Sequence, residues 1–497
     1  MPAHYPPFVI ITHLLNILFL LMLARSGLEV LSAHPKLYWS DDCPPGRQWA
    51  RFSRTEFGAD SRRPWTSQDE EESWNPVIAL PGRKNLGLGR HWHFLTLQFW
   101  IATGVVYVVL MFVSGYWVYL VPTSWSVVPQ AIRDVGTYLH FTLPEPLPGE
   151  PFNAAQKLAY FSVVFLLAPL QIATGAAMSP AVIGRFPWYA KIFGGKQGAR
   201  SLHFIGLVSF TGFIVVHTAM VIIHGLPVEL AKILLGGEDA DHSLAVIVGT
   251  LALIAIIVLQ VVFTVVSLRN PRLTERVTGA VSGPLQRVLS RALPSRQRYR
   301  REDISPYHRV NGYPPTSTEY REMARDGFAD YRLAVGGLVE RPTALSLPEL
   351  RALGTQTQIV NHNCIQGWNA VAEWSGVPLA RLLDRVRPLP GARYVVFYAL
   401  DDKGLTDGRG GRYGFYYQAT ALHLARQPQS LLALDMNGGP LPAEHGAPVR
   451  VRLENQLGFT MVKWVAAIEL VESTEGIGMG HGGFREDQQY YANHVGI

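Results

Sequence analysis

Apolar residues are concentrated in the first 268 positions of this chain, where they form five long runs separated by polar segments. A helix rises about 1.5 Å per residue, so a run of about 20 residues crosses a hydrocarbon core that is roughly 30 Å thick. The first run is the shortest of the five and depends on its flanks. The pattern predicts five membrane-spanning helices, at residues 8–23, 94–120, 158–177, 202–223 and 244–268.

The pattern changes beyond the fifth run. Nine arginines and one glutamate lie between residues 269 and 301. From about residue 304 onward, short runs rich in Val and Tyr are bounded by Gly or Pro, as is typical of β-strands. These runs predict strands at 331–339, 394–400, 448–453 and 465–472, with short helices at 347–353 and 379–386.

We therefore expect a multi-domain protein. Its predicted parts are an all-α transmembrane helix bundle over residues 1–268, a basic linker over 269–304 and an α+β, β-rich domain over 305–497. Composition agrees with a membrane protein, since 48% of the residues are hydrophobic and only 16% are charged, against about 25% in average soluble chains. The net charge of +6 is interpreted as a topology signal rather than as evidence for nucleic-acid binding.

Four histidines inside the apolar runs carry the first functional hypothesis. They are His13 in the first run, His93 beside the second, and His203 and His217 in the fourth. An ionisable group inside a bilayer is costly, so it is presumed functional. The 14 residues between His203 and His217 correspond to about 21 Å of helix rise and fall about 40° short of four full turns. Both side chains therefore share one helix face at two depths, as two stacked haems require.

Each haem then needs a second axial histidine from another helix. If the helices alternate in direction, His93 and His203 start on the same membrane side and can share one haem, while His13 can meet His217 near the opposite side. The alternative is that these histidines cap helices or bind backbone carbonyls. For any one histidine that alternative is the better interpretation, whereas the whole set favours haem.

Short motifs in this region resemble a known family. The motifs are Arg25–Leu28, Ala33–Trp39, Arg90–Phe94, Gln156–Tyr160 and Ser201–Phe204. They are similar to the b-type cytochrome subunits of formate dehydrogenases and NiFe hydrogenases, over about residues 8–225. The resemblance implies two haems b, ligated by His13 with His217 and by His93 with His203, and quinone exchange near one of them.

The chain has two cysteines, Cys43 and Cys364, which are too few for a disulfide framework or a CxxC metal site. Cys364 follows a strand-like run and precedes Gly367 and Trp368. Its thiolate could act as a nucleophile, a redox thiol or a metal ligand, and a lone buried cysteine is often inert packing. No protease-like surroundings are evident.

A second resemblance covers about residues 304–497. Its motifs are Asn363–Trp368, Trp374–Leu379, Gly446–Arg450, Leu457–Phe459 with Lys463–Trp464, and Gly482–Asp487. They are similar to sulfite-oxidase-type molybdopterin domains, in particular the branch that includes methionine-sulfoxide reductase. The resemblance implies a molybdenum–molybdopterin cofactor, with Cys364 as its catalytic molybdenum ligand. It also implies that Asn311, His445, Arg450 and Lys463 hold the pterin and its phosphate. The chain departs from many relatives at Gln366, where they carry Glu, and from some at His445, where they carry Asn.

Together the two halves predict a membrane-bound, molybdenum-dependent oxidoreductase. Electrons would pass between the quinone pool, two haems and a molybdenum centre that performs oxo transfer, with reduction of a small-molecule or protein-bound S- or N-oxide favoured. Sulfite-type oxidation that feeds quinone is the alternative within this class. Other classes also stay open: a cytochrome with a non-catalytic binding module, or a protein that anchors a separate catalytic subunit.

The expected location is the bacterial inner membrane, in contact with lipid, with several spans and with room for an additional subunit. The basic third loop, with Lys191 and Lys196, and the basic linker would place the C-terminal domain in the cytoplasm by the positive-inside rule. The two resemblances instead imply a cytoplasmic N-terminus and an exported molybdopterin domain. We therefore expect the C-terminal domain on the periplasmic side.

Overall fold

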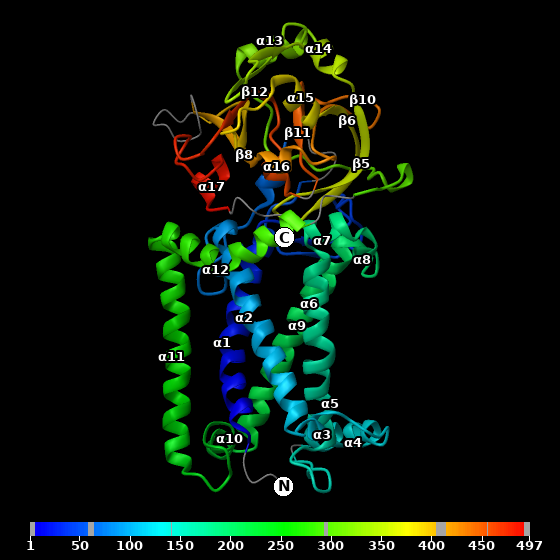
Figure 1. Cartoon of the computed structure of the whole chain (residues 1–497). Helices are drawn as coiled ribbons and strands as arrows, with labels where there is room; N and C mark the ends of the chain where they lie inside the picture. Colours follow the sequence, from blue (N-terminus) through cyan, green and yellow to red (C-terminus); the bar gives the residue numbers. More distant parts are fainter. Residues whose placement is uncertain are drawn as a thin grey trace. The chain divides into compact units, whose positions relative to one another are not determined.

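The computed structural model describes residues 5–57, 64–140, 142–292, 297–403, 414–454 and 456–491. The chain forms two compact units, each made of several chain segments (Figure 1). Unit 1 consists of Met1–Ser26, Trp92–Gly175 and Leu202–Arg269. Unit 2 consists of Gly27–His91, Ala176–Ser201 and Asn270–Ile497.

Unit 1 is built on five helices that are long and apolar enough to cross a membrane. Each has 24 to 29 residues, which exceeds the roughly 20 residues that a span requires. The helices are α1 (Pro7–Ser32), α2 (Leu86–Val113), α5–α6 (Ala154–Ala177, with a π-helical turn at Ser162–Leu167), α9 (Gly195–Ile223) and α11 (His242–Arg269). Shorter helices in the same unit are α3 (Trp117–Leu120), α4 (Val127–Leu139) and α10 (Leu226–Leu230).

Polar side chains connect the helices of unit 1 at a few points. Trp100 on α2 donates a hydrogen bond to Asn16 on α1 at 3.0 Å. Arg25 on α1 donates to Gln260 on α11 at 2.6 Å and to Thr264 at 2.8 Å. Most of the remaining surface of these helices is apolar, and apolar side chains pack about as well against lipid as against another helix. The hydrogen bonds therefore help to fix how neighbouring helices are rotated relative to one another.

The five predicted spans are all present, and two of them begin at least seven residues earlier than predicted. Helix α2 begins at Leu86 and α9 at Gly195, against predicted starts at 94 and 202. Most of the extra residues, 86–91 and 195–201, form helical turns that belong to unit 2. His93 and His203 therefore lie about two turns inside their helices rather than at the first residue, which corrects that part of the prediction.

Unit 2 contains two five-stranded sheets. The first sheet has the order β10-β9-β6-β5, with β11 paired to β9, and the second has the order β4-β3-β12-β7-β8. The strands of the first are β5 (Gln356–Asn363), β6 (Asn369–Pro378), β9 (Leu431–Met436), β10 (Gly439–Pro440) and β11 (Arg450–Arg452). Those of the second are β3 (Leu333–Gly337), β4 (Thr343–Leu345), β7 (Tyr394–Asp402), β8 (Phe415–Ala421) and β12 (Val465–Val471).

One buried cluster draws side chains from both sheets and from α15 (Leu379–Val386). Phe397 on β7 and Ile468 on β12 pack in this cluster with Leu432 on β9 and Val451 on β11. The apolar faces of the two sheets thus share one core. The strands predicted around residues 331, 394, 448 and 465 and the two predicted short helices are confirmed, whereas β4, β6, β8, β9 and β10 were not predicted.

The other segments of unit 2 are mostly loops and short helices. The segment 27–91 holds a two-stranded sheet, β1 (Lys36–Leu37) with β2 (Ala50–Arg51), and a 3-10 turn at Ser67–Glu70. The remaining helices are α7 (Pro180–Arg185), α8 (Pro187–Lys191), α12 (Pro271–Ala292), α13 (Thr318–Arg325), α14 (Leu347–Ala352), α16 (Leu422–Ala425) and α17 (Phe484–Gln489).

Candidate functional site

Unit 1 brings the four predicted haem histidines together as two pairs. The rings of His13 on α1 and His217 on α9 have centroids 6.2 Å apart. The rings of His93 on α2 and His203 on α9 have centroids 6.4 Å apart. Two imidazoles that bind one metal ion from opposite sides, each through a bond of about 2 Å, have centroids roughly 6 Å apart. Both pairs therefore have the spacing of axial ligands.

Hydroxyl groups orient the second pair. Ser26 Oγ lies 3.1 Å from Nδ1 of His93, and Thr174 Oγ1 lies 3.0 Å from Nδ1 of His203. Each hydroxyl also donates to the backbone carbonyl four residues earlier in its own helix. A ligand histidine commonly engages one ring nitrogen in this way and binds the metal through the other. In the first pair, Nδ1 of His13 is buried and has no hydrogen-bond partner among the residues that the structure describes.

Cys364 lies in the tight turn of the β5–β6 hairpin. Asn363 and Asn369 are the last paired residues of the two strands, so residues 364–368 form the turn. The backbone N–H of Cys364 donates to the carbonyl of Trp368 at 3.0 Å, and that of Gly367 donates to the carbonyl of Cys364 at 3.1 Å. Gly367 has a φ of 118°, a conformation that favours glycine. The turn holds the thiol in one position at the end of two buried strands.

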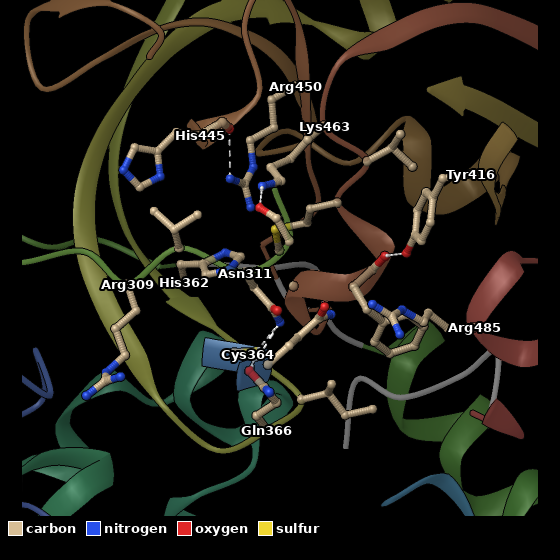
Figure 2. Close-up of a pocket in the computed structure, with 18 of the residues that line it drawn as sticks. Arg309, Asn311, His362, Cys364, Gln366, Tyr416, His445, Arg450, Lys463 and Arg485 are labelled. Atoms are coloured by element: carbon tan, nitrogen blue, oxygen red, sulfur yellow. Dashed lines mark hydrogen bonds between the residues drawn. The ribbon is translucent and has the colours of Figure 1, made fainter. Parts of the chain in front are cut away.

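The thiol faces a pocket of about 900 Å³, including its open mouth. Figure 2 shows Asn311, Arg450 and Lys463 pointing into this pocket with Cys364. The lining also includes His445, so the structure places all five residues predicted for the molybdopterin site around one cavity. They come from segments that are as much as 152 positions apart in the chain, since the first is residue 311 and the last is residue 463.

Amide groups surround the Cys364 sulfur. Asn311 Nδ2 and Gln366 Oε1 each lie 3.5 Å from Sγ, and the Asn311 amide also donates to Gln366 Oε1 at 3.2 Å (Figure 2). Trp368 Nε1 donates to the same oxygen at 3.0 Å. Burial raises the pKa of the Cys364 thiol to about 11, against the opposing effects of hydrogen bonds and of the Lys196 charge. A thiolate therefore needs a positive partner in this pocket.

Gln366 is held from its other end by a carboxylate. Its Nε2 donates to Glu71 Oε1 at 2.5 Å and to the carbonyl of Ser67 at 3.3 Å. These two acceptors fix the orientation of the amide, so that its oxygen faces Cys364. Burial raises the pKa of Glu71, while the bond from Gln366 acts in the opposite direction. The pocket thus keeps a carboxyl group near the turn even though position 366 itself is an amide.

Basic side chains gather at another part of the pocket. Lys463 Nζ donates to the carbonyls of Gly312 at 3.2 Å and Glu444 at 2.8 Å, and Arg450 Nη1 donates to the carbonyl of His445 at 2.9 Å. Burial lowers the pKa of Arg450 to about 9, with a further contribution from Arg452. Burial, together with Arg450, also holds the pKa of Lys463 well below its usual range. An anion bound between Arg450 and Lys463 would stabilise the charged forms of both side chains and would raise their pKa values.

Unpartnered polar atoms around the pocket fit a bound polar group. Nε of Arg450, Oδ1 of Asn311 and Nε2 of His308 are buried and have no hydrogen-bond partner in the described part of the chain. Buried polar atoms are normally hydrogen-bonded, so atoms that are not satisfied by protein indicate a ligand or water. A pterin, which has amide-like edges and a phosphate, could form hydrogen bonds with this set of donors and acceptors. The Cys364 thiolate could bind the metal that the pterin carries.

The segment 27–91 builds one wall of the same pocket. Gln68 and Glu71 line it beside Cys364. Behind the wall, Glu70 accepts from Lys36 at 2.5 Å and from Arg309 at 2.8 Å, and all three side chains are fully buried. Arg309 also donates to the carbonyl of Cys43 and to the hydroxyl of Tyr38.

Several pocket residues were missed in the sequence. Glu71 and Gln68 lie in a segment interpreted as an inter-helix loop, while His308, His362 and Arg485 lie near recognised motifs but were given no role. His362 accepts from Arg452 Nη1 at 2.8 Å, and burial holds its pKa well below its usual range. The available signal was the position of Arg485 inside the motif 482–487 and of His362 directly before the motif 363–368. No signal in the sequence connects residue 71 to residue 366.

Comparison with known proteins identifies both regions. Residues 4–236 match the family described as prokaryotic cytochrome b561, and residues 321–476 match the oxidoreductase molybdopterin-binding domain. The predicted fold class, an all-α membrane bundle plus a β-rich molybdopterin domain, is confirmed, as is the predicted pairing of a b-type cytochrome with a molybdenum oxidoreductase domain. Molybdopterin and haem b are thus the cofactors of the matched families.

Curated relatives cover parts of the chain. YedZ1 of Azospira oryzae, named as a protein-methionine-sulfoxide reductase subunit, is 35% identical over 162 residues, which are 33% of this chain and 55% of the relative. The protein-methionine-sulfoxide reductase catalytic subunit MsrP of Xanthomonas axonopodis pv. citri is 32% identical over 179 residues, which are 35% of this chain and 55% of the relative. The chain therefore spans about half the length of the curated relatives that it matches.

A solved structure, the sulfane dehydrogenase SoxCD of Paracoccus pantotrophus, aligns with 29% of this chain and 39% of that chain. The sequence identity is 23% and the TM-score is 0.25.

Proposed function

Because the chain joins a prokaryotic cytochrome b561 domain to an oxidoreductase molybdopterin-binding domain, we propose that it is a membrane-bound molybdenum oxidoreductase that draws electrons from quinol through two b-type haems. The observation that carries the proposal is the Cys364 turn, which faces a pocket ringed by unsatisfied polar atoms and buried cations. For the domains, we keep residues 1–268 as the cytochrome, 269–304 as the linker and 305–497 as the molybdopterin domain.

Two haems are supported by the two histidine pairs. His13 with His217 and His93 with His203 would each hold one iron, since both ring separations fit a shared metal. Ser26 and Thr174 would keep the second pair oriented through their contacts with Nδ1. The membrane segments exclude water from both positions, and that exclusion favours the neutral histidines that iron requires.

The molybdenum site is assigned residue by residue. Cys364 would be the protein ligand of the metal, Asn311 and His445 would hold the pterin, and Arg450 with Lys463 would bind its phosphate. When bound, the molybdenum–pterin group supplies two-electron oxo transfer. The chain's own part is to hold the thiolate at the hairpin turn, to orient Gln366 through Glu71, and to exclude water with the buried strands behind the turn.

We assign the direction as reduction of an S-oxide, on a small molecule or a protein, with N-oxides in the same class. Such a reaction breaks the S=O bond, consumes two electrons and two protons, and releases water. The names of the matched relatives, both linked to protein-methionine-sulfoxide reductase, support this direction. Oxidation of a sulfite-like substrate is the reverse use of the same site, and turnover with each substrate class separates the two.

We place unit 2 on the periplasmic side of the inner membrane. With five spans, the segments 27–91 and 176–201 and the C-terminal part from residue 270 all fall on one side, and unit 2 gathers these same three segments. The positive-inside rule favours the other face because two of the three segments are basic. A C-terminal tag that survives protease treatment of spheroplasts would refute the periplasmic placement.

The first test is the metal and haem content of the purified, detergent-solubilised protein. We expect about two haems and about one molybdenum per chain, and we expect Cys364→Ala to lose the molybdenum while it keeps the haems. Cys43→Ala is the matched control, because Cys43 is also fully buried but does not line the pocket. Haem without molybdenum in the natural protein would leave a cytochrome with a binding module, and the proposed enzyme would be wrong.

A further inference from the structure

Two side chains in the first turn of α9 form hydrogen bonds with both ends of the Cys364 turn. Lys196, which is 4% exposed, donates from Nζ to Asn363 Oδ1 at 3.0 Å, and Asn363 directly precedes Cys364. The next residue, Gln197, donates from Nε2 to the carbonyl of Gly367 at 2.9 Å and to Asn369 Oδ1 at 2.7 Å. All of these residues belong to unit 2, although Lys196 and Gln197 lie in the part of the sequence that matches the cytochrome.

Two buried cations of this helix lack a carboxylate partner. Among the described residues, neither Lys196 nor Arg200 forms an ion pair, whereas Lys36 and Arg309 share Glu70. Arg200 Nη1 donates to the carbonyl of Lys36 at 2.6 Å and Nη2 to that of His34. The guanidinium lies against Gly367, where a Cβ would come within 3.3 Å of Nε. Positive charge is thus buried directly behind the turn.

Burying an unpaired charge costs free energy, so two buried cations next to the turn of a metal ligand indicate a negative partner at that place. Asp41 contributes one carboxylate nearby, but its Oδ1 accepts from the backbone N–H of Gln197 at 2.9 Å rather than from Lys196 Nζ. Glu71, another carboxylate near the turn, accepts from Gln366. The negative charge left to balance Lys196 is that of the Cys364 thiolate, together with the cofactor that it would help to hold.

We propose that Lys196 is a positioning residue of the molybdenum site, whose ammonium group balances the charge of the Cys364 thiolate and raises the reduction potential of the bound metal. This inference rests on the proposed function. A nearby positive charge stabilises the reduced, more negative form of a metal centre, and the effect is strong in a water-poor interior. Lys196 is a cleaner probe than Arg200, because Arg200 also holds two backbone carbonyls in place.

The proposal is tested with three variants of the full-length protein. Lys196→Met removes the charge and Lys196→Arg keeps it. Lys191→Met removes an exposed charge five residues earlier in the same segment and is the matched control. The measurements are haem and molybdenum content, and the molybdenum midpoint potential from a redox titration followed by electron paramagnetic resonance.

We expect Lys196→Met to shift the molybdenum potential downward, Lys196→Arg to stay near the natural value and Lys191→Met to leave it unchanged. A Lys196→Met protein with full molybdenum and an unshifted potential overturns the proposal, and so does a Lys196→Arg protein that shifts as far as the methionine variant. Haem potentials serve as an internal reference in every sample.

Loss of molybdenum is also informative. If Lys196→Met is empty and Lys196→Arg is loaded, the positive charge is required to hold the metal, which supports the charge balance. If both are empty while their haem spectra are intact, the lysine acts through its shape and the proposal is wrong. Absence of molybdenum from the natural protein instead overturns the proposed function itself, so the two failures are distinguishable.

Discussion

The two units hold their functional side chains in opposite ways. In unit 1, His203 and His217 are placed by the period of one helix, α9, and their partners come from α1 and α2. In unit 2, Cys364 is placed by a hairpin turn, and the other pocket residues come from loops and short strands that are far apart in the chain. A helical bundle fixes its ligands through regular geometry, whereas the pocket depends on many separate contacts.

This difference predicts how each site fails. Loss of one residue in the bundle should remove one cofactor and spare the other, because each histidine pair is a local arrangement. Apart from Cys364, loss of one residue around the pocket should weaken cofactor binding by degrees, because the other contacts with the pterin and its phosphate would remain. The following changes test the contrast, from the largest expected effect to the smallest.

His203→Ala should remove one haem completely and leave the other. His93→Ala should remove the same haem, and the double variant should match either single variant, since each histidine alone cannot hold the iron. Haem content and the optical redox titration measure this result. His217→Ala should remove the other haem, with a different potential in the titration. A double variant that loses both haems would contradict two independent pairs.

Arg450→Ala should weaken retention of the molybdopterin by about 10-fold to 100-fold, because a charged hydrogen bond contributes roughly 1.5–3 kcal/mol. Lys463→Ala should act in the same direction. Molybdenum and pterin content after dialysis measures the loss, and the haem content should not change. Arg351→Ala is the control, since Arg351 pairs with Asp435 on an exposed surface, where such pairs contribute about 0–1 kcal/mol. Equal losses in both variants would contradict a phosphate site.

Protonation of two buried histidines in mild acid should destabilise unit 2, and this effect should be smaller and more gradual than those of the substitutions above. Burial, followed by neighbouring charges, holds the pKa of His308 and His362 well below the ordinary value of 6.5. Groups with a lowered folded pKa contribute stability above about pH 6.5, and that contribution is lost as the pH falls toward the folded pKa. The two histidines should therefore lower the unfolding temperature at pH 5 relative to pH 7, as followed by tryptophan fluorescence, whereas buried carboxyls with a raised pKa, such as Glu486, act in the opposite direction. His308→Gln should reduce this difference, and an unchanged difference would contradict the assignment.

The sequence predicted the bundle better than the pocket, for a physical reason. Helical periodicity shows in one stretch of chain, so the five spans and the facing positions of His203 and His217 could be found without the structure. Strands β5 and β6 bury polar residues such as Asn361 and Asn369, so their pattern lacks the alternation that marks a half-buried strand. The partners of Cys364 could be named only through family resemblance.

Charge in the segment 176–201 was interpreted as a topology signal alone. Lys196 and Arg200 fit that interpretation in sequence, because they stand just before an apolar run. The structure instead buries both behind the Cys364 turn. Likewise, Glu71 and Gln366 are 295 positions apart, and their contact depends on how two distant segments fold together. Such contacts have no local pattern to be recognised.

The discontinuity of unit 2 constrains how this protein can be made and recombined. During translation, Lys36 and Glu70 emerge more than 200 residues before Arg309, which is the second cation paired with Glu70 in a fully buried cluster. The buried cluster of the early segment therefore cannot be completed until residue 309 has been made. A gene split within residues 269–304 would separate the members of that cluster. A chimera that exchanges the catalytic part must carry residues 27–91 and 176–201 with it.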